Sequence, residues 1–154
     1  MTDLTKPFID PDKLEGPHGL VCQGYLNGEM HLGLKYFDLN KRGSPVFKMW
    51  EHIVPYAMVV LVVAQYTYDF GYIGFAASLL ITGLLAFWFV PRWHAKRVRL
   101  RALDMALSGE EGWEKLWAVG GLGLRLAKDD SIGCDSPDGD WRAFAQKYLS
   151  HLKN

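Results

Sequence analysis

The sequence predicts a mainly α-helical membrane protein built on a two-span transmembrane helical hairpin. Residues 53–90 carry one formal charge, Asp69, and the run from 70 to 90 carries none. A helix of about 21 residues is roughly 32 Å long, which matches the hydrocarbon core of a bilayer. Gly71 and Gly74 follow Asp69, so we expect the chain to turn there between two spanning helices.

The charges flanking the apolar stretch predict its orientation. The formal net charge is +0, which gives no general attraction to nucleic acid. Basic residues nevertheless gather directly after the second span: Arg92, Lys96, Arg97, Arg99 and Arg101. Such residues stay on the cytoplasmic side and attract anionic lipid headgroups. We therefore expect both termini in the cytoplasm, the turn outside, and membrane lipids, including anionic ones, as partners.

The chain is expected to have three parts: an N-terminal cytoplasmic arm (1–45), the transmembrane hairpin (46–91) and a cytoplasmic helical region (92–154). In the N-terminal arm, Asn27-Gly28 separates two partly apolar runs, which is typical of a type I′ turn. This signal predicts a β-hairpin over 20–37. A helix over 29–39 is the alternative, because its apolar residues also fit a period near 3.6.

Amphipathic helices are expected in the C-terminal part. Ser108 and Glu111 have the spacing of a capping box, which predicts a helix that starts there and stops at Gly120-Gly121. The following residues, 122–140, are rich in Gly and Asp and are predicted to form a loop.

Asp140 is placed to cap a last helix that runs to about Leu152. Trp141, Phe144 and Tyr148 share one face of that helix. Large aromatic side chains dominate the energetics of protein interfaces, so we expect these three to bind a protein partner, in a homo- or hetero-oligomer.

Small residues recur every four positions along the second span. They are Gly74, Ser78, Thr82 and Ala86. A stripe of this kind lets another helix approach closely. Its partner is the first span, a helix of another subunit, or both.

Two histidines are the only candidate ligands. His52 and His94 fall near the same ends of the two spans, and paired histidines can ligate haem or a transition metal. No third ligand follows at a metal spacing, so no cofactor or metal is expected. Glu51, at the membrane entrance, is expected to have a structural role, either reaching water or, as we favour, pairing with Arg92. No catalytic motif has a recognisable context, which predicts a protein that is not an enzyme.

The layout is similar to that of the YfbV-type family of small two-span bacterial inner-membrane proteins. The shared features are Pro55 in the first span, Gln65 ten residues later and Trp88 near the end of the second. They cover a short part of the chain, and no site residue is carried over from the family.

Together these features predict an accessory or scaffold subunit that mediates protein–protein interactions within a larger membrane complex, in a bacterial inner membrane. One alternative is an immunity-type protein that neutralises a membrane-active toxin. Another is a small haem- or metal-binding electron-transfer subunit.

Overall fold

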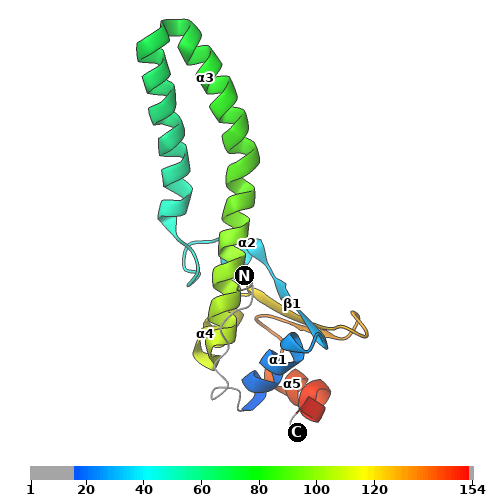
Figure 1. Cartoon of the computed structure of the whole chain (residues 1–154). Helices are drawn as coiled ribbons and strands as arrows, with labels where there is room; N and C mark the ends of the chain where they lie inside the picture. Colours follow the sequence, from blue (N-terminus) through cyan, green and yellow to red (C-terminus); the bar gives the residue numbers. More distant parts are fainter. Residues whose placement is uncertain (1–15, 153–154) are drawn as a thin grey trace, which may run out of the picture. The chain divides into compact units, whose positions relative to one another are not determined.

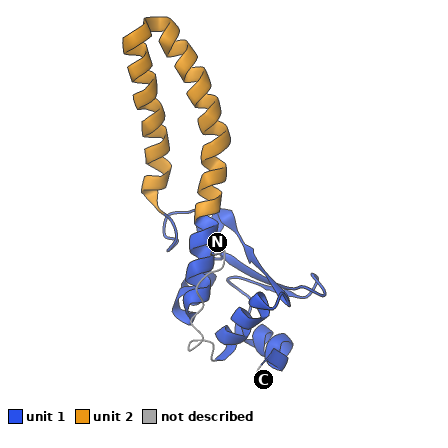
Figure 2. Cartoon of the chain, viewed as in Figure 1, with its two compact units in different colours: residues 1–47, 98–154 blue, residues 48–97 orange. Residues whose placement is uncertain are grey.

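The computed structural model describes residues 16–152, which form a mostly helical chain with one small sheet (Figure 1). Its contacts divide the chain into two compact units (Figure 2). Unit 1 combines the chain up to Phe47 with the chain from Val98 onward, and unit 2 is Lys48–Arg97. The N-terminal and C-terminal parts, which we expected to be separate, therefore share one unit.

Apart from Lys48, unit 2 consists of residues of helix α3, Met49–Ser108, which is long and apolar enough to span a membrane. Within this helix Gly71 leaves the helical conformation, with φ 60° and ψ −143°. Only glycine adopts that backbone conformation easily, so the chain reverses at this point. The first arm (49–70) and the second arm (72–97) then run side by side (Figure 1). The ring centroids of His52 and His94, one from each arm, lie 4.1 Å apart.

The predicted N-terminal β-hairpin is wrong, because its first half is helix α1, Gly16–Leu26. The Asn27-Gly28 signal ends this helix: Gly28 has φ 72°, and its N–H donates to the Tyr25 carbonyl. The next N–H donates to the Gly24 carbonyl, which completes a Schellman motif. The alternative helix over 29–39 is wrong as well, because strand β1, Met30–Leu34, precedes the short helix α2, Tyr36–Leu39.

The loop predicted over 122–140 contains two strands, β2, Leu122–Leu126, and β3, Gly133–Asp135. The sheet is antiparallel with the order β1-β2-β3, and Leu32 faces Leu124 across the first pair. Leucines at 122, 124 and 126 alternate along β2 and lie on one face. This period of two outweighs the turn-forming composition of the surrounding residues.

Two helices complete unit 1. Helix α4, Glu110–Ala118, is capped by Gly109 and not by the predicted Ser108. The Ser108 hydroxyl donates instead to the Met105 carbonyl, at 3.2 Å. The predicted stop is confirmed: Gly120 has φ 78° and closes a second Schellman motif.

Helix α5, Trp141–Leu149, begins as predicted, because the Asp140 carboxylate accepts the Ala143 N–H at 2.9 Å. A short 3-10 turn, η2, Ser150–Leu152, extends it.

The core of unit 1 lies between the sheet and these helices. Trp113 is fully buried, and its ring stacks on Trp117 with centroids 5.9 Å apart. Trp141 packs on the same ring at 5.5 Å. Because aromatic rings bury more apolar area than any other side chain, this triplet is the centre of the unit.

Candidate functional site

The outward surface of unit 2 is apolar and exposed. Phe87 is 81% exposed, Ile73 80% and Val60 67%, although they lie in the most apolar part of the chain. Soluble monomers rarely expose contiguous apolar patches of this kind. The surface is therefore suited to lipid or to an apolar partner.

The predicted stripe of small residues faces the first arm. Gly74 and Ser78 are buried, and Thr82 and Ala86 are half-buried. A Cβ at Gly74 would overlap the Tyr66 carbonyl oxygen of the first arm. At Gly74 the stripe therefore forms a seam between the two arms, because the missing side chain lets the backbones approach.

Polar groups near this seam are satisfied locally. The Thr82 hydroxyl donates to the Ser78 carbonyl at 2.6 Å, one turn back in the same helix. The Gln65 amide donates to Asp69 at 3.0 Å, close to the turn. Each of these polar groups therefore forms its hydrogen bond within its own arm. In apolar surroundings a polar group without a hydrogen bond would be costly.

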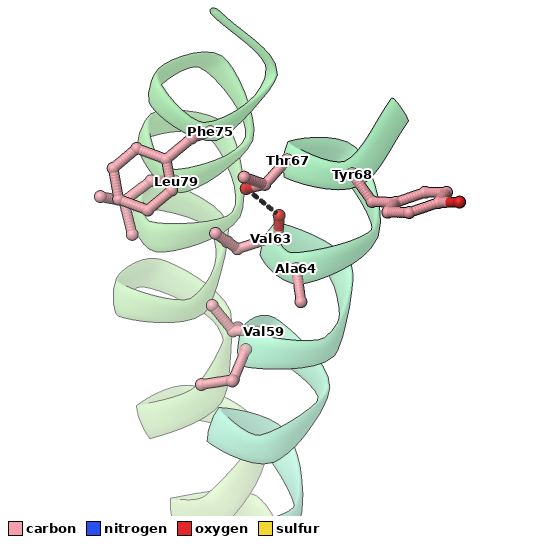
Figure 3. A pocket seen from close by; sticks show the side chains of 8 residues that line it. Val59, Val63, Ala64, Thr67, Tyr68, Phe75 and Leu79 are labelled. Atoms are coloured by element: carbon pink, nitrogen blue, oxygen red, sulfur yellow. Dashed lines mark hydrogen bonds between the residues drawn. The ribbon is translucent and has the colours of Figure 1, made fainter. Parts of the chain in front are cut away.

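Two apolar grooves flank the seam. One of about 600 Å³ is lined from both arms, with Val59, Val63 and Ala64 on the first and Phe75 and Leu79 on the second (Figure 3). The Thr67 hydroxyl at its wall donates to the Val63 carbonyl at 2.7 Å (Figure 3), which leaves the groove apolar. A second groove of about 370 Å³ is lined by residues that include Tyr66, Ala77 and Ser78.

A polar cluster joins the other ends of the arms. Glu51 has a side chain only 11% exposed, and its carboxylate lies 3.7 Å from the Arg97 guanidinium and 3.9 Å from His94 Nε2. The expected pairing of Glu51 with Arg92 is wrong, because Arg97 takes that place. Helical geometry explains the difference: His94 and Arg97 are three residues apart on one face, whereas Arg92 points elsewhere.

His52 and His94 do approach each other. Their ring centroids lie 4.1 Å apart at an interplanar angle of 46°. Two histidines that ligate one haem lie on opposite faces of its ring, and imidazoles in such direct contact leave no space for a haem between them. Among residues 16–152, no group of three or more His, Cys, Asp or Glu side chains is placed to hold a metal ion.

The basic residues predicted to meet the membrane surface differ in their surroundings. Arg92, Lys96, Arg97 and Arg99 are exposed, and Arg101 is half-buried. The Arg92 guanidinium lies 3.7 Å from the ring centroid of Trp88. Trp88 and Trp50 are 64% and 74% exposed, as in the aromatic belt of a membrane interface.

Helix α5 does not present its predicted partner-binding face. Trp141 is 3% and Phe144 6% exposed, and both belong to the core of unit 1. Tyr148 is half-buried beside Phe144, with ring centroids 5.1 Å apart. The partner-binding role of these residues stays a prediction, but Trp141 and Phe144 would have to leave the core to perform it.

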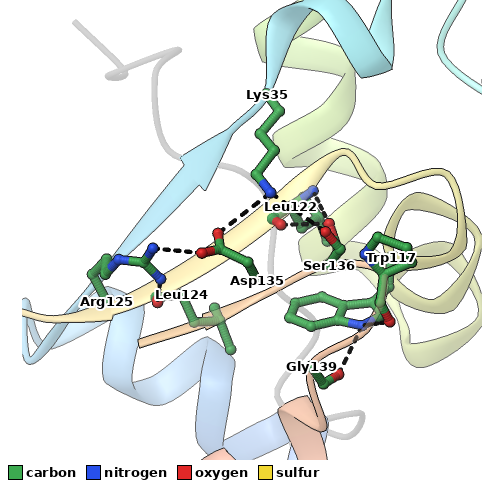
Figure 4. Close-up of polar contacts among 9 residues, drawn as sticks. Lys35, Trp117, Leu122, Leu124, Arg125, Asp135, Ser136 and Gly139 are labelled. Carbon is green, nitrogen blue, oxygen red and sulfur yellow. Dashed lines mark hydrogen bonds and ion pairs between the residues drawn. The ribbon is translucent and has the colours of Figure 1, made fainter. Parts of the chain in front are cut away.

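A network of polar contacts fastens β3 to the sheet (Figure 4). The Asp135 carboxylate lies 2.5 Å from Arg125 and 3.4 Å from Lys35. The hydrogen bond from Arg125 is the main reason that the pKa of Asp135 is lowered. The Trp117 indole N–H donates to the Gly139 carbonyl at 3.1 Å. Asp135 therefore ties β3 to Arg125 of β2 and to Lys35, which the composition of this segment did not reveal.

A cysteine–histidine pair that the sequence did not reveal lies inside unit 1. The Cys22 sulfur lies 3.7 Å from His18 Nε2, which itself lies 2.8 Å from the Ala106 carbonyl. Burial raises the pKa of Cys22 to about 11. The thiol therefore stays protonated at neutral pH, which disfavours nucleophilic chemistry.

No family model, no curated protein and no solved structure matches this chain. The similarity to the YfbV-type family gains no support from these comparisons.

Proposed function

We propose that the chain is an integral membrane protein whose two arms of α3 cross a bacterial inner membrane as a two-span hairpin, with both termini in the cytoplasm. The observation that carries this proposal is the exposed apolar surface of both arms. In a bilayer, lipid would cover that surface, so its apolar side chains would not be exposed to water. The basic residues from Arg92 onward support the orientation, and the exposed Trp50 and Trp88 suit a membrane interface.

We further propose that the protein is an accessory or scaffold subunit of a larger membrane complex. The grooves beside the seam support this role, because each offers apolar surface whose lining includes a small residue, Ala64 in one and Ala77 in the other. Small residues favour close packing of another membrane helix. Since α5 turns Trp141 and Phe144 into the core, the grooves are the better candidates for contact with a partner subunit.

Co-purification from detergent tests this role. Ala64→Leu and Ala77→Leu fill the two grooves, and we expect each to remove partner subunits from the purified complex. Leu80→Ala is the control, because Leu80 is 66% exposed and lines neither groove. Equal recovery of partners with all three variants would contradict a groove-mediated scaffold role.

A further inference from the structure

The exposed cations of unit 2 are not equivalent. Arg97 faces the Glu51 carboxylate at 3.7 Å, so part of its charge is offset within the protein. Arg92 and Lys96 are exposed, and no carboxylate among residues 16–152 forms an ion pair with either. They are four positions apart on one helix, which places them on the same face.

Arg92 is held in place before any ligand arrives. Its guanidinium stacks on Trp88 at 3.7 Å and donates one hydrogen bond to the Trp88 carbonyl at 2.7 Å. A guanidinium has five N–H donors in a planar fork that fits phosphate, so further donors remain for a ligand. Stacking also reduces the side-chain entropy that binding would cost.

We propose that Arg92 and Lys96 bind the phosphate of an anionic phospholipid headgroup. This inference rests on the proposed membrane insertion of α3. The pair directly follows the uncharged stretch 70–90, where headgroup phosphates meet the end of a spanning helix. An anionic lipid is favoured over a zwitterionic one, because the latter adds a cation that opposes the two basic side chains.

Lipid retention tests the site. The full chain is reconstituted into vesicles of equal parts phosphatidylglycerol and phosphatidylcholine, washed with alkaline carbonate, and extracted in mild detergent. Native mass spectrometry then gives the ratio of the two lipids that stay bound. We expect enrichment in phosphatidylglycerol for the natural chain, and a loss of about tenfold in that ratio for Arg92→Gln with Lys96→Gln.

Two controls separate the site from general charge. Lys128→Gln with Lys147→Gln removes the same charge from exposed positions of unit 1 and should leave the ratio unchanged. Arg92→Lys with Lys96→Arg keeps both charges but removes the guanidinium that stacks on Trp88, so its enrichment should fall between those of the natural chain and the double Gln variant. Inorganic phosphate, added at the lipid concentration during extraction, should not displace the bound lipid.

The outcomes distinguish this inference from the function on which it rests. If carbonate strips the natural chain from the vesicles, membrane insertion is refuted and the lipid site with it. If the chain stays but the Arg92–Lys96 variant keeps its enrichment, or the control in unit 1 loses as much, only the lipid site is refuted. Displacement by inorganic phosphate would show a general anion site and overturn the lipid assignment.

Discussion

Gly74 packs directly on the Tyr66 carbonyl, so that the two arms of α3 touch through their backbones beside the turn. A Cβ at position 74 would overlap that oxygen and lie 2.7 Å from Cβ of Phe70. Gly74→Ala should therefore push the arms apart and lower the free energy of unfolding by about 1–3 kcal/mol.

Gly83 provides a matched control for this substitution. It lies in the same arm, and nothing is within 4 Å of the position that its Cβ would occupy. Gly83→Ala should be neutral or stabilising by up to about 1 kcal/mol, because alanine is the better helix former. Thermal unfolding of both variants in the same detergent measures the difference. Equal tolerance of both would argue against a close seam.

The Glu51–Arg97 ion pair should contribute to holding the arms together. Glu51 is nearly buried, whereas the Arg97 side chain is 57% exposed, so solvent weakens the pair. A double-mutant cycle of Glu51→Gln and Arg97→Gln should give a coupling free energy of about 0.5–1 kcal/mol.

The same cycle with Arg92→Gln in place of Arg97→Gln is the control. Its coupling should be near zero, because Arg92 stacks on Trp88 instead. A larger coupling for Arg92 than for Arg97 would restore the pairing expected from the sequence and refute the arrangement described here.

Several local signals in the sequence predicted features that depend on neighbouring residues, although the capping box at Ser108 did not form. Asp140 caps α5, Gly120 ends α4, and the stripe at Gly74 and Ser78 marks a helix seam. Each of these three signals predicts one local structure, because a helix cap or a close approach of two backbones needs a particular residue type at one position.

The sheet could not be predicted in the same way. Asn27-Gly28 encodes a backbone reversal that suits a hairpin turn as well as a helix end, and only the packing of α1 decides between them. Gly24 shows this packing: a Cβ there would lie 3.1 Å from Leu149 of α5. β1 precedes α3 in the chain and pairs with β2, which follows it. No pattern in one sequence shows which strands, so far apart along the chain, will pair.

Phe144 should be essential for the stability of unit 1. Its side chain is 6% exposed in the core, so Phe144→Ala should cost about 3–5 kcal/mol. Gln146→Ala, at an exposed position of the same helix, should change little. Urea unfolding followed by tryptophan fluorescence compares the two. Unchanged stability with loss of co-purifying partners would instead support the partner-binding face predicted from the sequence.

The two cysteines should differ in reactivity. Burial raises the pKa of Cys22 to about 11, so at pH 8 roughly one thiol in a thousand is ionised. Cys134 is only half-buried, although burial and the nearby Asp140 and Asp135 also raise its pKa. Iodoacetamide should therefore label Cys134 in the folded chain and Cys22 only after unfolding, as read by peptide mass spectrometry. Equal labelling rates in the folded chain would contradict the buried position of Cys22.

The raised pKa of Cys22 also predicts a pH dependence. The unfolded thiol ionises near its ordinary pKa of 9.0, while the folded thiol holds its proton to about 11. This contribution to stability is therefore complete below pH 9 and is lost as the pH rises toward 11. Cys22→Ala should remove the alkaline loss, measured as urea midpoints across that range.

The orientation of the hairpin is the central claim, and cysteine accessibility in spheroplasts tests it most directly. Tyr72 is 84% exposed beside the turn at Gly71, so Tyr72→Cys in a Cys134→Ser background places a thiol at the predicted outer end. Lys128→Cys places one in unit 1. We predict that a membrane-impermeant maleimide labels Tyr72→Cys in intact spheroplasts, and Lys128→Cys only after the membrane is opened. Labelling of Lys128→Cys in intact spheroplasts, with Tyr72→Cys protected, would contradict the account.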